Sequence, residues 1–228
     1  MHVLAFTGAG ISAESGLRTF RDSGGLWENH RVMDVATPEG WARDPGLVLD
    51  FYNARRRQMR EAEPNAAHRA LADLEAHCGV TVVTQNVDDL HERAGSTQVL
   101  HLHGRLDQAR SVLDEHSLFP VTGDIQLGQC CPRGGQLRPH VVWFGEWVLE
   151  LEAAAAAIQR ADWVLAIGSS LSVYPAAGLL QHAPASAHKR LVALEVDEPP
   201  ADYIWLREAA SSAVPRIVED ILSHAAQN

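Results

Sequence analysis

The chain has 228 residues, 46% of them hydrophobic and 21% charged, which fits a globular protein with one good core, or with one large and one small domain. Its formal net charge of −10 argues against a broad nucleic-acid surface. No apolar run reaches the roughly 18 residues that span a bilayer, and no basic leader precedes the first strand. We therefore expect a cytoplasmic protein with neither a membrane nor a nucleic acid as partner.

Residues 3–13 combine an apolar strand with a glycine turn. VLAF is followed closely by GAGISA, which fits the pattern G-x-G-x-x-A. In nucleotide-binding folds this turn lets the backbone approach a pyrophosphate and lets a helix pack on the strand. The pattern alone leaves open a plain glycine turn in another α/β protein.

The following stretch, residues 16–30, does not fit an ordinary dehydrogenase. A second strand ending in Asp or Glu is expected about 20 residues after the glycine turn, but GLRTFRDSGGLWENH predicts a loop. The string GAGISAESG, with Phe20 and Arg21 at the matching spacing, closely resembles the signature of the sirtuins, the NAD-dependent protein deacylases. We expect the loop to form a mobile flap over the nicotinamide end of the dinucleotide.

The resemblance to sirtuins implies NAD as cofactor and acylated lysine side chains of proteins as partners. It implies transfer of the acyl group to NAD, with nicotinamide and O-acyl-ADP-ribose as products. An NAD glycohydrolase or ADP-ribosyltransferase on the same fold stays open, as does an NAD-binding sensor without turnover. In the first segment the implied NAD contacts are Gly8, Ala9, Gly10, Ser12, Glu14, Phe20, Arg21 and Trp27.

The stretch from Leu47 to Met59 predicts a helix that is apolar at first and basic later. Tyr52 and Arg55 lie three residues apart, so they share a face of that helix. The alternative is a solvated basic helix with Arg55, Arg56 and Arg57 facing water. The Tyr-x-x-Arg pair resembles that of the bacterial desuccinylase and demalonylase type of sirtuin. A guanidinium and a phenol can clamp the carboxylate of a succinyl or malonyl group.

Helices are expected over residues 31–62, with breaks at Pro38 and at Asp44–Pro45. Another helix opens at PNAAH, residues 64–68, where we expect His68 to cap or pack rather than to act in catalysis.

Residues 80–83, VTVV, predict a buried strand that ends in the polar string TQNVD. Ligands of open parallel sheets bind beyond the carboxyl ends of strands, although these polar residues also favour turns. TQNVDDLH resembles the T-Q-N-V-D-x-L-H string of sirtuins. By that resemblance Asn86 orients the nicotinamide ribose and the attacking water, Asp88 binds the nicotinamide carboxamide, and Gln85 lies near the ribose.

Two histidines follow in HLHG, residues 101–104, and point to the same side of a strand. A metal site would need an acidic or cysteine partner, and none lies nearby in the sequence. The resemblance assigns His103 as the general base, and an imidazole suits that role because it can accept a proton at neutral pH. His101 is assigned no role.

Residues 105–140 form an insertion that departs from the family. Most sirtuins bind a structural zinc through two C-x-x-C pairs, whereas here Gly134 stands where a second-pair cysteine is expected. The adjacent Cys130 and Cys131 cannot close a tetrahedral site by themselves, and His116 or His140 could complete one only by an unusual fold of the loop. We therefore predict no zinc and assign no metal ligands, while binding of another metal by the two cysteines stays open. We expect a short, mobile segment held by its apolar side chains. These are Leu113, Leu118, Phe119, Val121, Ile125 and Leu127.

Two later strings carry the expected peptide contacts. LRPHVVWFGE, residues 137–146, predicts a strand returning to the main domain and resembles the sirtuin segment that pairs with an extended peptide. GSSLSVYP, residues 168–175, resembles the opposite wall. The implied peptide contacts are Val142, Phe144, Gly145, Val173 and Tyr174. The implied NAD contacts are Gly168, Ser169 and Ser170.

Residues 190–195 predict another buried strand, which ends in Glu195. A carboxylate there could accept hydrogen bonds from both adenosine ribose hydroxyls and repel a 2′-phosphate, which favours NAD over NADP. A charged strand end is the alternative. Asp197 and Ala210 complete the implied NAD contacts, before a closing helix over residues 214–224.

The resemblance covers residues 3–222 and implies an α/β fold, a doubly wound parallel Rossmann-like sheet with a smaller inserted module of helices and loops. The Rossmann-like part is expected from residues 1–30, 80–104 and 140–228, and the small module from residues 31–79 and 105–139. The sequence gives no prediction of oligomeric state.

Overall fold

A computed structural model describes residues 1–18, 26–27 and 30–226, with residues 26 and 27 as backbone alone. Its larger sheet is six-stranded, in the order β11-β10-β9-β1-β4-β5, and every neighbouring pair is parallel. The strands are β1 (His2–Thr7), β4 (Gly79–Thr84), β5 (Val99–His101), β9 (Trp163–Ile167), β10 (His188–Val192) and β11 (Ile204–Leu206). An α/β fold with a Rossmann-like sheet is confirmed.

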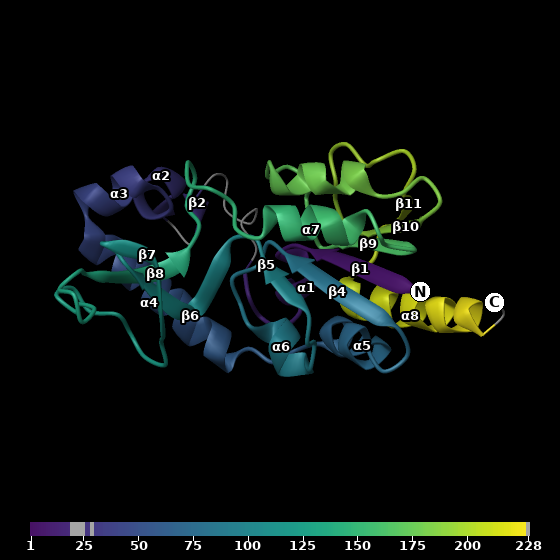
Figure 1. Ribbon diagram of the computed structural model, residues 1–228, viewed down its shortest axis with the longest axis horizontal. Coiled ribbons are helices and arrows are strands. Elements are labelled where there is room, and N and C mark those ends of the chain that lie inside the picture. The colour runs from purple at the N-terminus through teal and green to yellow at the C-terminus, as the bar shows by residue number, and fades with distance from the viewer. Residues whose placement is uncertain (19–25, 28–29, 227–228) are drawn as a thin grey trace.

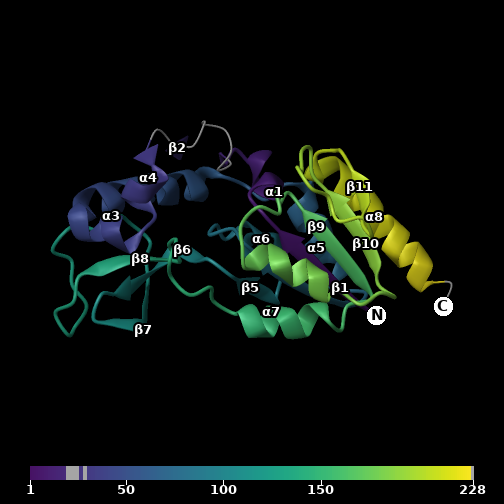
Figure 2. The same cartoon turned by 90° about the horizontal axis from the view of Figure 1, so that it is seen from above.

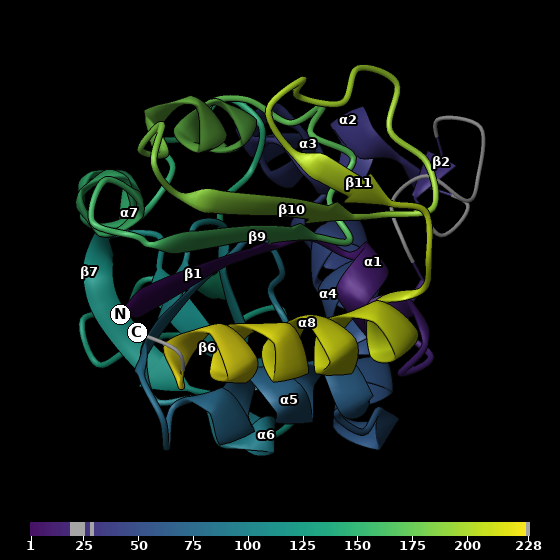
Figure 3. The ribbon, with the colours of Figure 1, turned by 90° about the vertical axis from the view of Figure 1, so that its right-hand side faces the viewer.

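The larger sheet is buried on both faces, as its continuous apolar strands predict. Alternate residues of β1 and β9 contribute to two separate cores. One core lies under α5 (Ala66–Leu74) and α8 (Ala210–Ala225), which run side by side (Figure 3). The other lies under α7 (Leu151–Ile158) and the 3₁₀ helix η1 (Ala176–His182). Within the described residues, no helix has the length and apolar character needed to cross a membrane.

The winding of the sheet reverses between β1 and β9. From β1 the chain continues to β4 and β5 on one side, and later elements add β9, β10 and β11 on the other. Two glycine turns meet there, because Gly8 N donates to Ile167 O at 2.9 Å and Gly10 N to Gly168 O at 2.8 Å. A Cβ on Gly10 would lie 2.7 Å from Gly168 Cα, so only glycine fits. Such a switch point is where open α/β sheets bind ligands.

A smaller module lies at one end of the molecule, opposite the C-terminal end of α8 (Figures 1 and 2). It pairs three helices with an antiparallel sheet in the order β7-β6-β8. Its elements are α2 (Val32–Val35), α3 (Pro38–Arg43), α4 (Pro45–Glu61), β6 (Gly104–Ser111), β7 (Asp114–Pro120) and β8 (Leu137–Val141). The short strands β2 (Leu26–Trp27) and β3 (His30–Arg31) pair with each other beside this module. Two short helices belong to the part with the larger sheet. They are α1 (Gly10–Ala13), which follows β1, and α6 (Leu90–Ala94), which precedes β5.

Proline and its preceding residue set the helix starts in the small module. Pro38 and Pro45 are the first residues of α3 and α4, and Thr37 and Asp44 cap these helices by accepting from Gly40 N and Leu47 N. The expected helix breaks are therefore confirmed.

The module differs from the expectation in several ways. It contains a sheet rather than helices and loops alone, and β8 pairs with β6 instead of joining the larger sheet. α5 falls within residues 31–79 but packs on the larger sheet. Of the apolar side chains expected to hold the insertion, Ile125 is buried, whereas Leu113, Leu118 and Leu127 are exposed. β10 ends at Val192, before the predicted strand end at Glu195.

Candidate functional site

The loop that follows β4 lies at the switch point and is held by the segment around β5. Four successive carbonyls, from residue 84 to residue 87, accept hydrogen bonds from residues 101–106. The pairs are Leu102 N to Thr84 O (2.9 Å), His103 Nδ1 to Gln85 O (3.0 Å), His101 Nδ1 to Asn86 O (3.1 Å) and Leu106 N to Val87 O (2.9 Å). The loop is thus fixed although the strand has ended.

The side chains of this loop reach the glycine turn after β1. Asn86 Nδ2 donates to Gly8 O at 3.2 Å and to Ser12 Oγ at 3.1 Å, and Ser12 Oγ donates to Asp88 Oδ2 at 3.1 Å. All three side chains are buried. Burial raises the pKa of Asp88, while hydrogen bonds from Leu90 N and Ser12 act in the opposite direction. The structure therefore brings Gly8, Ser12, Asn86 and Asp88 together.

His103 follows β5 and has one defined ring nitrogen. Its Nδ1 faces a carbonyl oxygen, which can only accept, so Nδ1 carries the proton and Nε2 is left with a lone pair. Burial lowers the pKa of His103, partly offset by the hydrogen bond to Gln85. Because the net effect lowers the pKa, the imidazole is neutral, and its Nε2 can accept a proton.

The turn after β9 joins the same group. Ser169 is buried, and its Oγ donates to Gln85 Oε1 at 2.9 Å, beside the close approach of Gly168 to Gly10. Ser170 instead bonds Ser172 through their hydroxyls at 2.6 Å. Four chain segments, following β1, β4, β5 and β9, therefore meet at this edge of the sheet.

The segment after β8 connects the small module to His103. Val142 N donates to His103 O at 2.9 Å, and Phe144 N donates to Ala36 O at 3.0 Å. Beyond it, Gly145 has a φ of 91° and open space where a Cβ would stand. On the expected opposite wall, Tyr174 is exposed and Val173 is half-buried.

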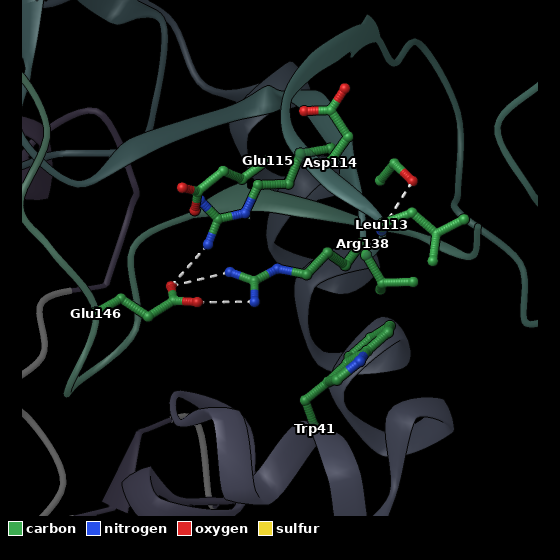
Figure 4. A pocket seen from close by; sticks show the side chains of 9 residues that line it. Trp41, Leu113, Asp114, Glu115, Arg138 and Glu146 are labelled. Carbon is green, nitrogen blue, oxygen red and sulfur yellow. Dashed lines mark hydrogen bonds and ion pairs between the residues drawn. The ribbon is translucent and has the colours of Figure 1, made fainter. Parts of the chain in front are cut away.

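Glu146 anchors this segment from within the module. Its carboxylate accepts from Trp143 N at 2.8 Å, from Arg110 at 2.8 Å and from both terminal nitrogens of Arg138 at 2.9 Å. Arg110, Arg138 and Glu146 line a pocket of about 350 Å³ that also touches Trp41 (Figure 4). This pocket lies beside the turn between β6 and β7, apart from the glycine turns of the switch point.

Tyr52 and Arg55, on α4, lie next to this segment. The Tyr52 side chain is fully buried and its oxygen accepts from Trp143 Nε1 at 3.1 Å. Burial raises the pKa of Tyr52, so the phenol keeps its proton. Arg55 is half-buried, with its guanidinium carbon 5.7 Å from the centre of the Phe51 ring. Arg56 does not face water as the alternative supposed, since it is fully buried.

The other predicted residues are more dispersed. Glu14 accepts from Ser211 N and Oγ and so joins α1 to the start of α8, where Ala210 is buried. Glu195 and Asp197 are exposed beyond β10, and Ala9 is exposed before α1. Phe20 and Arg21 lie outside the described residues, as does the Trp27 side chain. The predicted flap falls in the same part of the chain.

His68 is buried and forms the capping box of α5 with Asn65, as expected. Three residues that the sequence did not reveal support the loop after β4. His101 contacts the loop at Asn86 O, and Glu92 and Arg105 hold His101 in place. His101 Nε2 lies 2.9 Å from Glu92 Oε1, and Arg105 donates to the same oxygen at 2.5 Å. The signal was present in the two histidines of HLHG, but the acidic partner of His101 comes from α6.

The cysteines of the insertion do not fit a zinc site. Cys131 Sγ lies 3.2 Å from Ser111 Oγ, and Cys131 N donates to Gly135 O, so a hydrogen-bonded turn stands at this place. Cys130 is exposed, with its Sγ 3.4 Å from Gly128 O. Across residues 1–18 and 30–226, no three His, Cys, Asp or Glu side chains are grouped so that they could hold a metal ion.

The fold and this edge of the sheet define a Rossmann-like protein with a histidine-centred site at its switch point. The chain belongs to the Sir2 family, whose model matches residues 8–175. A relative from Vibrio vulnificus, named NAD-dependent protein deacylase, is 48% identical, covering 100% of this chain and 96% of the relative. One from Bacteroides thetaiotaomicron with the same name is 50% identical, covering 95% and 96%.

Solved structures agree with this assignment. A mutant Sir2 homologue in complex with ADP-ribose matches with a TM-score of 0.89 and 37% identity, over 100% of this chain and 94% of the other. A Sir2 homologue in complex with NAD matches with a TM-score of 0.87 and 38% identity, over 98% and 90%.

Proposed function

We propose that this protein is an NAD-dependent protein-lysine deacylase. The observation that carries the proposal is the neutral His103, whose Nδ1–H is held by Gln85 O while Nε2 can accept a proton at the switch point of the sheet. The names of the relatives at about half identity support it. The products that we propose are free lysine side chains, nicotinamide and O-acyl-ADP-ribose.

The residues at the switch point fit NAD. Gly8, Gly10 and Gly168 let the turns after β1 and β9 pack closely against each other at the switch point, which is where open α/β sheets bind nucleotides. Ser12, Asn86 and Asp88 supply polar atoms at the same edge. When bound, NAD supplies the ribose that receives the acyl group and nicotinamide as the leaving group.

Each polar residue has a defined task in this proposal. Asn86, fixed by Gly8 and Ser12, orients the ribose and water, and Asp88 accepts from the nicotinamide carboxamide. His103 Nε2 removes the proton of a ribose hydroxyl. Positioned proton transfer of this kind contributes about 10² to 10⁴-fold to the rate.

The peptide would lie along the segment after β8. Val142 and Phe144 are fixed through their backbone N–H groups, and the open space at Gly145 leaves room for an extended chain to pair with this segment. The half-buried Val173 and the exposed Tyr174 would form the other wall. Because pairing of this kind uses backbone groups, we expect weak preference for the sequence around the lysine.

We further propose that the preferred acyl groups are succinyl and malonyl. Trp143, which bonds the Tyr52 oxygen, directly follows Val142, which bonds His103 O. Tyr52 is thus tied to the segment that contacts the general base, and Arg55 lies three residues further along α4. A protonated phenol and a guanidinium can bind the terminal carboxylate of such a group, whereas an acetyl group offers no carboxylate.

The testing experiment compares nicotinamide release with succinyl-, malonyl-, acetyl- and unmodified lysine peptides of one sequence. We expect release to require an acylated peptide and to be fastest with succinyl or malonyl. Equal release with the unmodified peptide would overturn the deacylase and indicate an NAD glycohydrolase or ADP-ribosyltransferase.

A further inference from the structure

His101 is a buried residue at the end of β5 that the proposed reaction does not use. Its Nδ1 lies 3.1 Å from Asn86 O and its Nε2 lies 2.9 Å from Glu92 Oε1. A backbone carbonyl can only accept, and so can an ionised carboxylate. Both ring nitrogens must therefore carry a proton for both hydrogen bonds to form.

The state of Glu92 decides whether that condition holds. A protonated carboxyl could donate to a neutral ring, but the same Glu92 oxygen accepts from Arg105 Nη1 at 2.5 Å. Burial raises the pKa of Glu92, whereas the guanidinium of Arg105, which donates to this oxygen whatever the state of His101, lowers it and favours the carboxylate. Glu92 is thus ionised, and the ring that donates to it is an imidazolium.

The surroundings of His101 favour a positive charge. The titratable and charged groups around the ring and its partners come from three elements. They are Glu92 and His91 from α6, Arg105 and Asp107 from β6, and Asp88 and Asp89 from the loop after β4. Burial lowers the pKa of His91 well below the ordinary value, so it is neutral. Four carboxyl groups therefore stand against two guanidiniums, that of Arg105, which pairs with Glu92 and Asp107, and that of Arg93 on α6, which pairs with Asp89. Burial raises the pKa of Asp88 and Asp89, so Glu92 and Asp107 are the carboxylates that count most.

We propose that His101 is a positively charged positioning residue that ties the loop carrying Asn86 and Asp88 to α6. One ring nitrogen holds the carbonyl of Asn86 and the other is held by Glu92, which Arg105 fixes in turn. The consequence for catalysis rests on the proposed deacylase function. The two histidines of HLHG then carry different charges, His101 positive and His103 neutral.

The charge state is tested without any ligand. Ring-nitrogen NMR at neutral pH is expected to find His101 with protons on both nitrogens and His103 with a proton on Nδ1 alone. A neutral His101 at that pH would overturn the proposal. Because this readout needs neither NAD nor peptide, it stands whether or not the protein proves to be a deacylase.

The positioning role is tested with His101→Gln and Glu92→Gln, with His116→Gln as control because His116 is an exposed histidine on β7. We expect His101→Gln to lower kcat by about ten- to a hundred-fold, as small misplacements of reacting groups do. In Glu92→Gln, ring-nitrogen NMR at neutral pH should find a proton on only one nitrogen of His101, since a neutral amide stabilises the imidazolium less than the carboxylate that lies 2.9 Å from Nε2 in the wild type. We expect kcat of this variant to fall as well.

A merely structural role predicts another result. If both variants lose stability but keep the wild-type kcat, or if His101 keeps both ring protons in Glu92→Gln, the positioning role is wrong. Should His101→Gln fail to fold, Glu92→Gln alone decides, because it keeps the ring and replaces the carboxylate that His101 and Arg105 share. His116→Gln should leave kcat and the pH profile unchanged.

Discussion

His101 and His103 lie two residues apart and bond consecutive carbonyls of the same loop, yet their second nitrogens face different surroundings. Glu92 lies 2.9 Å from His101 Nε2, whereas nothing in the described contacts of His103 gives its Nε2 a donor or a carboxylate. A neutral ring with an available lone pair suits proton abstraction, and a charged ring suits anchoring. The two histidines therefore have different roles because His101 Nε2 has a carboxylate partner, Glu92, and His103 Nε2 has no such partner among the described contacts.

The pH dependence of His103 is the first prediction. Because burial lowers the pKa of His103 below the ordinary 6.5, the base form persists to lower pH and is lost only as pH falls through the lowered value. The acid limb of kcat/KM, which reports the free enzyme, should therefore have its midpoint below 6.5. His103→Asn should remove this limb and lower kcat by about 10² to 10⁴-fold.

Calorimetry should show that His103→Asn still binds NAD, since the substitution leaves the glycine turns after β1 and β9 unchanged. A variant that keeps the wild-type kcat would refute His103 as the base.

The second residue-scale prediction concerns the acyl clamp. Arg55→Met should lower kcat/KM for a succinyl peptide by at least about tenfold, because a charge-assisted hydrogen bond contributes roughly 1.5–3 kcal/mol. It should change kcat/KM for the acetyl peptide little. Arg57→Met is the matched control, since Arg57 lies on the same helix but pairs with Asp124 on the exposed side. Equal losses with both peptides in Arg55→Met would rule out the clamp.

Single residues differ in how far the sequence predicts them. His103, Asn86 and Asp88 stand in strings whose order and spacing are visible in the chain. The bracing role of His101 is invisible there, because it depends on α6 approaching β5 in the fold. The burial of Arg56 could not be predicted either, since a run of three arginines does not indicate which side chain points toward β6.

At the scale of elements, α4 is joined to the segment between β7 and β8 by a buried amide. Asn53 donates to Ile125 O, and its Oδ1 accepts from both Ile125 N and Arg56 Nη1, at 2.7–2.9 Å. Asn53→Ala would leave these three groups without that partner in the interior. We expect it to lower the free energy of unfolding by about 2 kcal/mol or more.

Urea denaturation measures this loss, with Gln58→Ala as control because Gln58 is exposed on the same helix. Equal stability of the two variants would contradict the role of Asn53.

The turn at Cys131 leads to a prediction on metal removal. Ser111, Cys131 and Gly135 form hydrogen bonds where most sirtuins would need thiolate ligands. Elemental analysis of the purified protein should therefore find no stoichiometric zinc, and a strong chelator should leave the melting temperature unchanged. One bound zinc per chain, or a marked loss of stability on chelation, would show that the site is closed in some other way.

The elements of the larger sheet were largely predictable and those of the insertion were not. β4 and β9 are continuous apolar runs bounded by turn residues, so a local pattern suffices. β7, DEHSLFP, is mostly polar and half exposed, and it forms because it pairs with β6. β6 in turn pairs with β8, about thirty residues further on, and such distant pairing leaves little local signal.

At the scale of the whole molecule, the two parts have separate tasks in the proposed reaction. The carboxyl edge of the larger sheet carries the groups for NAD and for proton transfer, and the small module carries the acyl clamp. The segment from Val142 to Glu146 connects them, because it bonds His103 at one end and is anchored by Arg110 and Arg138 at the other. The order of the motifs along the chain favours this division, although it gave no sign of the sheet in the module.

The most direct test of the deacylase assignment is mass spectrometry of the products formed from NAD and a succinyl-lysine peptide. We expect nicotinamide, succinyl-ADP-ribose and the unmodified peptide in equal amounts, and no nicotinamide when the acylated peptide is left out. Nicotinamide accompanied by free ADP-ribose, at a rate that does not depend on the peptide, would contradict it.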